Sequence, residues 1–295
     1  MHKLMTALVL LVVLLFAIGC GSSEQIHSQS IGLSGVGNAR ELGGYSTTDG
    51  HTVKHGVFLR TAALANATSQ DIAKLQDTYH LAVVVDLRMT LEVQGAPDPE
   101  IPDAKNLHLR IIDEQAMQKS IADAQKEGLD LSNKLDLLKA AIKSGILNDQ
   151  MYINFLSGKQ GKESYGIMFQ EILALPEGRS LLFHCTQGKD RTGCAAMLIL
   201  SALGVDENTI IDDFMLTNTF NAALIESERK MLTEQGYSGE ELDTLMKAMD
   251  EVDPQYMTNA LDWMKGNYGS VIGYITQELG ITDEQIHTLR AKYLE

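Results

Sequence analysis

One cysteine and one arginine stand at a spacing that can hold and transfer a phosphoryl group. Cys185 and Arg191 are separated by five residues in the string His-Cys-Thr-Gln-Gly-Lys-Asp-Arg-Thr-Gly, residues 184–193. A loop of this length can surround one phosphate with backbone N–H groups, and a helix that begins at its end adds positive potential. That potential also favours the nucleophilic thiolate. We therefore predict that Cys185 attacks phosphorus and that the planar guanidinium of Arg191 binds two phosphate oxygens.

The other residues of this loop receive roles from their types. Thr192 is expected to hydrogen-bond the sulfur and help it leave a phosphocysteine intermediate. Gly188 permits a turn that a side chain would obstruct, and Gly193 lets the following helix start close to the sheet. The predicted phosphate-binding residues are Thr186, Gln187, Gly188 and Lys189 in the loop, together with Arg88. For Arg88 the alternative is a structural ion pair with a neighbour such as Glu92 or Glu41.

The elements that must position this loop alternate between strands and helices. The pattern predicts strands at 57–60, 82–86, 107–112 and 180–184, the last leading directly into the loop. A helix opens at Thr68, and the apolar run 194–203 reads as a buried helix closed by Gly204. Such alternation indicates an α/β fold, with a central, mainly parallel sheet flanked by helices.

Two further regions are predicted to be helical. From about residue 205 onward the pattern is helical, with capping boxes expected at Ser238 and at Thr282, the second with a hydrophobic staple. The polar, helix-prone segment 114–160 is interpreted as an insertion. We expect one domain, residues 35–295, without internal repeats.

The first residues have the pattern of a signal peptide of the lipoprotein type. A short basic start is followed by an apolar run that is too short to span a bilayer as a helix. It ends Ala-Ile-Gly-Cys at residues 17–20, which resembles a bacterial lipobox with Cys20 as the acylated residue. We predict a signal peptide over 1–19, a lipidated tether over 20–34 and a body outside the cytoplasmic membrane, lipid-anchored to the bacterial cell membrane. The alternatives are an uncleaved anchor or a secretory signal with an incidental cysteine.

Composition excludes several other functions. The formal net charge of −15 argues against a nucleic-acid partner and against a polybasic membrane patch, which leaves the lipid anchor as the expected membrane contact. Only Cys185 and Cys194 remain in the body, which is not a disulfide framework, and Cys194 is expected to be a buried packing residue. No His/Asp cluster has metal-ligand spacing, so neither a metal nor another cofactor is expected.

The reactive loop resembles the signature of protein tyrosine phosphatases, and its Gly-Lys-Asp-Arg-Thr-Gly form is similar to the bacterial tyrosine/lipid phosphatase family. Residues 38–45, Asn-Ala-Arg-Glu-Leu-Gly-Gly-Tyr, resemble that family's Asn-Phe-Arg-Asp-Leu-Gly-Gly-Tyr stretch, with Ala39 and Glu41 as departures. Asp-Leu-Arg at 86–88, with Glu92 shortly after, resembles a second family element. The resemblance covers roughly residues 35–295. It implies a phosphatase that acts on phosphorylated proteins or phosphoinositides.

The resemblance also implies that Asp190, within the loop, is the general acid. The alternative is Asp113, where related dual-specificity enzymes carry their acid, although Asp113 also reads as a helix cap. The resemblance also implies that Lys189 indicates activity on phosphoinositides as well as phosphotyrosine. The alternative is that Lys189 only raises the local positive potential. Two other classes use a similar loop: an anion-binding surface lipoprotein without turnover, and a sulfurtransferase-like or arsenate-reductase-like enzyme.

Overall fold

A computed structural model describes residues 29–115, 118–119 and 150–295. The predicted signal peptide, the acylation of Cys20 and most of the predicted insertion 114–160 therefore lie outside the described residues. Within the described part of the chain, no helix combines the length and apolar character needed to cross a membrane.

The core of the fold is a five-stranded, mostly parallel sheet, which confirms the predicted α/β class. Its order is β1-β2-β5-β3-β4, and only the β1–β2 pair is antiparallel. The strands are β1 (Arg40–Glu41), β2 (Phe58–Thr61), β3 (Leu81–Asp86), β4 (Lys105–His108) and β5 (Ser180–His184). β5 lies in the centre of the sheet, so both of its faces are buried.

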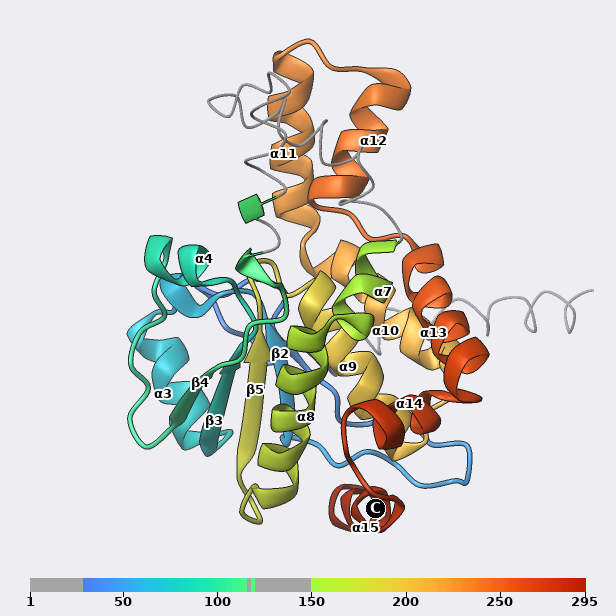
Figure 1. Ribbon diagram of the computed structural model, residues 1–295. Coiled ribbons are helices and arrows are strands. Elements are labelled where there is room, and N and C mark those ends of the chain that lie inside the picture. The colour runs from blue at the N-terminus through green and yellow to red at the C-terminus, as the bar shows by residue number, and fades with distance from the viewer. Residues whose placement is uncertain (1–28, 116–117, 120–149) are drawn as a thin grey trace, which may run out of the picture.

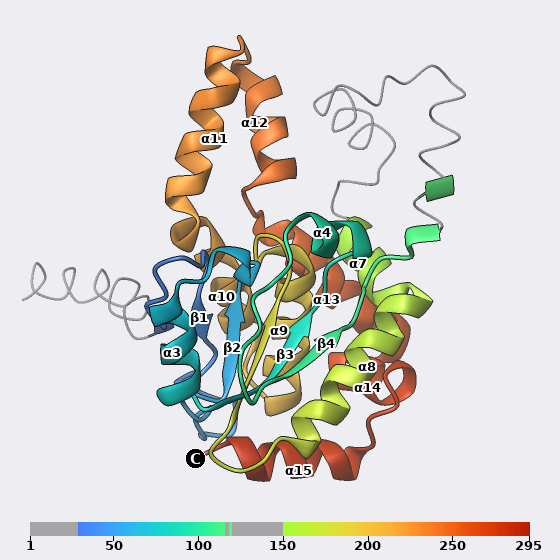
Figure 2. The ribbon, with the colours of Figure 1, turned by 90° about the vertical axis from the view of Figure 1, so that its left-hand side faces the viewer.

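Helices cover both faces of this sheet (Figures 1 and 2). Because successive strand side chains alternate between faces, Leu181 and Phe183 of β5 pack into the larger core, beside α8 (Lys159–Ala174) and α9 (Asp190–Leu203). Leu182 packs into the smaller core on the other face, beside α3 (Ser69–Asp77). The helices up to the reactive loop are η1 (Leu64–Asn66), α3 (Ser69–Asp77), α4 (Thr90–Gly95), α7 (Gln150–Ser157) and α8 (Lys159–Ala174). Those after it are α9 (Asp190–Leu203), α10 (Glu207–Phe220), α11 (Ala222–Glu234), α12 (Gly239–Met249), α13 (Pro254–Tyr268), α14 (Val271–Glu278) and α15 (Asp283–Tyr293).

Several predicted boundaries differ from the structure. The strand expected at 107–112 is β4, which ends at His108 because its partner β3 ends at Asp86, opposite His108. Residues 30–34, assigned to the tether, pack with the body, since Ile31 is only 1 % exposed. In the predicted insertion, α7 places Tyr152, Phe155 and Leu156 in the main core, so this part of 114–160 belongs to the domain itself.

Helix-end predictions met mixed outcomes. Thr68 and Thr282 each form a capping box at the start of α3 and α15, and Gly204 ends α9 in the left-handed conformation. The capping box expected at Ser238 is wrong, because its side chain makes no cap hydrogen bond to α12.

Helices α11 and α12 form a hairpin that projects from the body (Figures 1 and 2). The hairpin has a small core of its own, centred on Leu232, Leu245 and Met246. Its base lies next to the loop between β5 and α9, so it is relevant to the site.

Candidate active site

The loop between β5 and α9 carries Cys185 at the carboxyl edge of the sheet. In the strand register His184 pairs with Thr61 on one side and with Asp86 on the other, so three parallel strands end level with one another. Crevices outside the carboxyl ends of parallel strands are common ligand sites. Cys185 follows His184 directly and is 2 % exposed.

The loop is held from outside through its carbonyl groups. The Asn38 side-chain amide donates to the carbonyls of Gln187 and Gly188, at 3.0 and 2.8 Å. Arg60 Nη2 also donates to the Gly188 carbonyl, at 3.0 Å. The Thr186 carbonyl accepts the backbone N–H of the second residue after β2, at 3.2 Å. Three successive carbonyls therefore point away from the centre of the loop.

These contacts fix the direction of the loop N–H groups. In a trans peptide the C=O of one residue and the N–H of the next point in opposite directions, and the described residues contain no cis peptide. The N–H groups of Gln187, Gly188 and Lys189 therefore point into the loop. A concave row of N–H groups binds anions, so the predicted phosphate cradle has a physical basis here.

Gly188 confirms its predicted part in this turn. Its φ is +66°, a conformation that favours glycine, and an added Cβ would lie 2.4 Å from the Thr61 carbonyl oxygen. A side chain at this position would push the loop away from β2.

A fully buried ion-pair network holds the residues from the N-terminal part of the chain that contact the loop. Asp213 of α10 accepts Arg40 Nε at 3.1 Å and Arg60 Nη1 at 2.5 Å, and its neighbour Tyr45 donates to it at 3.1 Å. We call Arg40, Arg60 and Asp213 the Asp213 network. Burial alone would raise the pKa of Asp213, but the two arginines lower it below its usual value. Burial, with Arg40 nearby, lowers the pKa of Arg60 to about 10.

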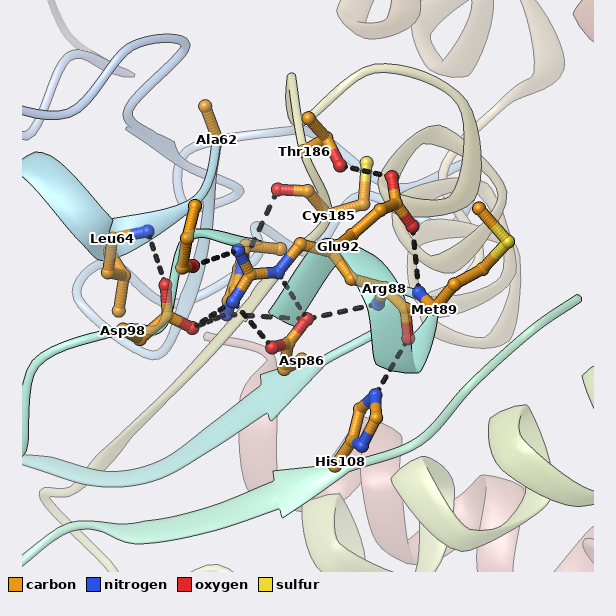
Figure 3. Close-up of polar contacts among 12 residues, drawn as sticks. Ala62, Leu64, Asp86, Arg88, Met89, Glu92, Asp98, His108, Cys185 and Thr186 are labelled. Carbon is orange, nitrogen blue, oxygen red and sulfur yellow. Dashed lines mark hydrogen bonds and ion pairs between the residues drawn. The ribbon is translucent and has the colours of Figure 1, made fainter. Parts of the chain in front are cut away.

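On the other side of the loop, Arg88 is buried in a second network, the Arg88 network of Asp86, Arg88 and Asp98 (Figure 3). Arg88 donates to both oxygens of Asp86, at 2.9 and 2.7 Å, and to Asp98 Oδ2 at 2.8 Å. Its remaining Nη1 donates to the Ala96 carbonyl at 2.8 Å. The structure thus places the guanidinium in an ion pair, as in the alternative prediction but with other partners, and not at the loop mouth.

His184 joins this network beneath the reactive cysteine. Its Nε2 lies 3.0 Å from Asp98 Oδ2, within ion-pair distance. Asp86, Asp98 and His184 together bring three metal-ligand atoms within 4.8 Å of one another. The positive Arg88 guanidinium already binds both carboxylates, so this cluster is better suited to holding the loop than to holding a cation.

Arg191 is oriented by Glu92 of α4. Its Nη1 and Nη2 donate to the two Glu92 oxygens at 2.6 and 2.8 Å, a bidentate contact. Thr186 Oγ1 donates to the same carboxylate at 2.5 Å, and Figure 3 shows Glu92 reaching toward Thr186 and Cys185. Burial alone would raise the pKa of Glu92, but the hydrogen bonds and charge of Arg191 lower it to about 2.

Two predicted phosphate contacts turn their side chains toward the helical hairpin. Lys189 Nζ donates to the Met249 carbonyl at 2.9 Å, and only 3 % of Lys189 is exposed. The Gln187 amide donates to Asp250 Oδ1 at 2.6 Å. Both residues offer their backbone N–H to the loop interior, while their side chains fix the base of the hairpin.

The two candidate acids occupy different settings. Asp190 begins α9, beside the loop, and its Oδ1 accepts the hydroxyl of Tyr152 at 2.5 Å. Asp113 is exposed, and its Oδ1 accepts the Gln115 N–H at 3.0 Å, which is the cap arrangement predicted as its alternative role. Asp190 therefore lies beside the loop, whereas Asp113 is an exposed cap.

Comparisons with known proteins agree with this geometry. A model of the tyrosine phosphatase family matches residues 31–295. The chain belongs to this family.

A protein of Cupriavidus necator named as a tyrosine-protein phosphatase is 29 % identical over 267 residues, which cover 88 % of this chain and 86 % of that protein. The triple specificity protein phosphatase PtpB of Mycobacterium tuberculosis is 24 % identical, over 89 % of this chain and 98 % of its own length. A tyrosine-protein phosphatase of Nostoc commune is 26 % identical, over 80 % and 73 %. The predicted enzyme class, a protein-tyrosine phosphatase, is thereby confirmed.

Three predictions about the start of α9 in this tyrosine phosphatase have different outcomes. Cys194 is fully buried, as predicted, and burial raises the pKa of its thiol. Gly193 approaches α10 and not the sheet, because an added Cβ would lie 3.0 Å from the ring of Phe214. The Thr192 hydroxyl is buried and has no hydrogen-bond partner among the described residues, so the predicted bond to the Cys185 sulfur is not formed here.

Sequence reasoning missed four residues that shape the site of this phosphatase. They are Arg60, Asp98, Tyr152 and Asp213. None belongs to the loop motif; Arg60, Asp98 and Tyr152 contact it from distant parts of the chain, and Asp213 acts on it through Arg60. A polar residue inside an otherwise apolar element, such as Arg60 in β2, was the only available signal.

Proposed function

We propose that this tyrosine phosphatase hydrolyses phosphomonoesters, with phosphotyrosine as the favoured substrate, through a phosphocysteine intermediate on Cys185. The observation that carries the proposal is the outward anchoring of three loop carbonyls. It turns the N–H groups inward beside Cys185, while Arg191 stands six positions further along the chain with its guanidinium held by Glu92. Donors fixed in advance around a developing negative charge lower the barrier of a phosphoryl transfer.

In the first step the Cys185 sulfur forms a bond to phosphorus and the bond from phosphorus to the ester oxygen breaks. Asp190 gives its proton to the leaving oxygen. Arg191 and the loop N–H groups bind the three equatorial oxygens. In the second step water attacks phosphorus, its proton passes to Asp190, and the S–P bond breaks to return the thiolate.

The position of Lys189 supports phosphotyrosine over phosphoinositides. A polyphosphorylated headgroup needs cations besides Arg191, but the Lys189 ammonium contacts the Met249 carbonyl and Arg88 contacts two carboxylates. A phosphotyrosine side chain presents a single phosphate to Arg191.

The test compares the purified protein with its Cys185→Ser variant. We expect phosphate release from a phosphotyrosine peptide, less from a phosphoserine peptide and least from short-chain phosphoinositides, with a metal chelator present. Cys185→Ser should abolish release. The matched control is Cys194→Ala, which removes the other buried thiol and should retain activity.

Other outcomes would contradict the proposal. Unchanged release by Cys185→Ser would exclude a phosphocysteine intermediate. Binding of inorganic phosphate without turnover by folded wild-type protein would favour an anion-binding protein, and thiol-dependent arsenate or sulfur turnover would favour those enzymes. Faster release from phosphoinositides than from the peptide would overturn the substrate ranking.

We also propose that the protein is acylated at Cys20 and lies outside the cytoplasmic membrane. The supporting observation is the apolar run that ends Ala-Ile-Gly-Cys at residue 20. Labelled palmitate should enter the full-length protein expressed in a bacterium and should not enter a Cys20→Ser variant. Equal labelling of both would refute acylation at Cys20.

A further inference from the structure

We propose that Tyr152 is a positioning residue for proton transfer, because it fixes which oxygen of Asp190 carries the proton. The inference depends on the proposed role of Asp190 as general acid. Tyr152 lies in the first turn of α7, is fully buried, and donates its hydroxyl to Asp190 Oδ1 at 2.5 Å. Neither the loop motif nor the family resemblance assigns it a role.

Packing fixes the direction of the Tyr152 hydroxyl. The ring meets Phe214 edge to face at 5.7 Å and lies 5.6 Å from the Tyr256 ring and 6.1 Å from the Phe155 ring. Phe214 itself packs against the backbone of Gly193, where an added Cβ would lie 3.0 Å away. Phe214, packed between them, therefore fixes the position of the Tyr152 ring relative to the start of α9.

Tyr152 acts as a donor in this contact. Burial, and then the charge of Asp190, raises the pKa of Tyr152 well above its ordinary value, so the phenol keeps its proton. A carboxyl oxygen that accepts this hydrogen bond is poorly placed to carry a proton of its own. The transferable proton of Asp190 is thereby assigned to Oδ2.

The other side of Asp190 is also restricted. Lys189 Nζ lies 3.8 Å from Asp190 Oδ2 and is held in place by the Met249 carbonyl at 2.9 Å. This distance is too long for a hydrogen bond, so Oδ2 stays open to carry the proton, while the hydrogen bond from Tyr152 to Oδ1 limits the rotation of the carboxyl group. A catalytic group held in one orientation does not lose rotational freedom when the reaction begins.

The contact with Tyr152 also changes in strength during the reaction. When Asp190 gives its proton to the leaving oxygen, it becomes a carboxylate, and hydrogen bonds to ionised acceptors are about twice as strong as neutral ones. Tyr152 therefore stabilises the state after proton transfer more than the state before it. The gain matters most when the leaving oxygen needs the proton, as it does for a weakly acidic phenol.

The experiment compares two aryl phosphates on wild type and on Tyr152→Phe. Phenyl phosphate has a weakly acidic leaving phenol, and difluoro-methylumbelliferyl phosphate has a strongly acidic one. We expect Tyr152→Phe to lower kcat/KM about tenfold for phenyl phosphate, as for the loss of one hydrogen bond to a charged group, and less than about twofold for the other substrate.

The matched control is Tyr274→Phe. Tyr274 is equally buried and donates its hydroxyl at 2.7 Å to the carbonyl of Leu156, also in α7. This variant removes a comparable buried hydrogen bond at a distance from Asp190, so it should leave the ratio of the two kcat/KM values unchanged. Thermal unfolding of both variants checks that each is folded.

Asp190→Asn separates failure of the inference from failure of the proposed function. If Asp190→Asn slows phenyl phosphate selectively and Tyr152→Phe slows both substrates equally, Tyr152 only packs the site and the inference is overturned. If Asp190→Asn itself shows no selectivity, the acid assignment fails and the inference fails with it. Selectivity in both variants, with no further selectivity in the double variant, supports the coupling.

Discussion

The two ion-pair networks that hold the reactive loop differ in how their charges are shared. In the Asp213 network one carboxylate serves two arginines, and all three side chains are at most 1 % exposed. In the Arg88 network one arginine serves two carboxylates, whose side chains are 11 % and 16 % exposed. The first network contacts the loop carbonyls through Arg60, and the second reaches His184 through Asp98.

This difference gives the two networks different roles, one in the stability of the fold and the other in the geometry of the loop. Without Asp213, two buried cations would lose their shared carboxylate, and a buried charge without a partner is strongly unfavourable. Without Asp98, Arg88 keeps the bidentate contact with Asp86, and nearby water can compensate part of the loss. We therefore expect the Asp213 network to determine stability and the Arg88 network mainly to tune the loop.

The largest effect is expected from Asp213→Asn. The substitution leaves Arg40 and Arg60 without a carboxylate in a dry site, so the free energy of unfolding should fall by about 3–5 kcal/mol. Urea unfolding followed by circular dichroism measures it. Asp212→Asn, an exposed neighbour in α10, is the control and should change little. Equal urea midpoints for Asp213→Asn and Asp212→Asn would show that the Asp213 network does not determine stability.

Asp98→Asn should have a smaller effect on stability and a visible effect on activity. The variant retains the Arg88–Asp86 pair, so we expect a loss of about 1–2 kcal/mol, the usual range for a weakened buried polar contact. Because His184 precedes the nucleophile and loses the nearer of its two carboxylate neighbours, kcat/KM for a phosphotyrosine peptide should fall about tenfold. Asp103→Asn, exposed in the same connection, is the control. An Asp98→Asn variant that loses stability but keeps full activity would contradict a tuning role.

The ion pair between Glu92 and Arg191 belongs to neither network, and its contribution can be tested by its dependence on pH. Its pKa is lowered from 4.5 to about 2, so it contributes stability above pH 4.5 that is lost as the pH falls toward 2. The contribution should be about 1 kcal/mol, because the carboxylate is partly exposed. Thermal unfolding at pH 3 to 7 should show Glu92→Gln below wild type near neutrality, with the gap closing toward pH 3. A gap that stays constant with pH would mean that Glu92 acts by packing alone.

The smallest effect is expected at the surface of the hairpin. Arg229 pairs with Asp243 at 3.0 Å and Glu251 at 2.7 Å, but 39 % of its side chain is exposed. Arg229→Gln should therefore change the free energy of unfolding by less than about 1 kcal/mol, as measured by urea unfolding. A loss as large as that of Asp213→Asn would show that exposure does not decide the ranking.

The sequence allowed prediction of the features that depend on local order. The strand–loop–helix unit around Cys185, the turn at Gly188 and the cap at Thr68 each depend on neighbouring residues and backbone geometry. The α/β class followed in the same way, because apolar periodicity is a local signal. These predictions agree with the structure.

Contacts across the fold were beyond the same reasoning. Asp213 lies in a helix, where an acidic residue usually faces water, and only the side chains of Arg40 from β1 and Arg60 from β2 make it a buried partner. Lys189 was expected near phosphate from its place in the loop, but the carbonyl of Met249, 60 positions later, orients its side chain. Tyr152 sat in a segment interpreted as an insertion, although its helix packs into the core.

The anchoring of the loop by distant residues also affects when the nascent chain acquires activity. The Asn38–Gly188 contact spans 150 positions and the Arg40–Asp213 contact spans 173. At a synthesis rate of about 5–20 residues per second, roughly 8 to 35 s separate the emergence of the two ends of these contacts. Asn38 and Arg60 precede the loop in the chain, so the anchoring is complete only when Asp213, which follows the loop, has also emerged. An unfolded chain, in which these contacts are absent, would therefore be catalytically inert, and activity would appear only when the whole domain has folded.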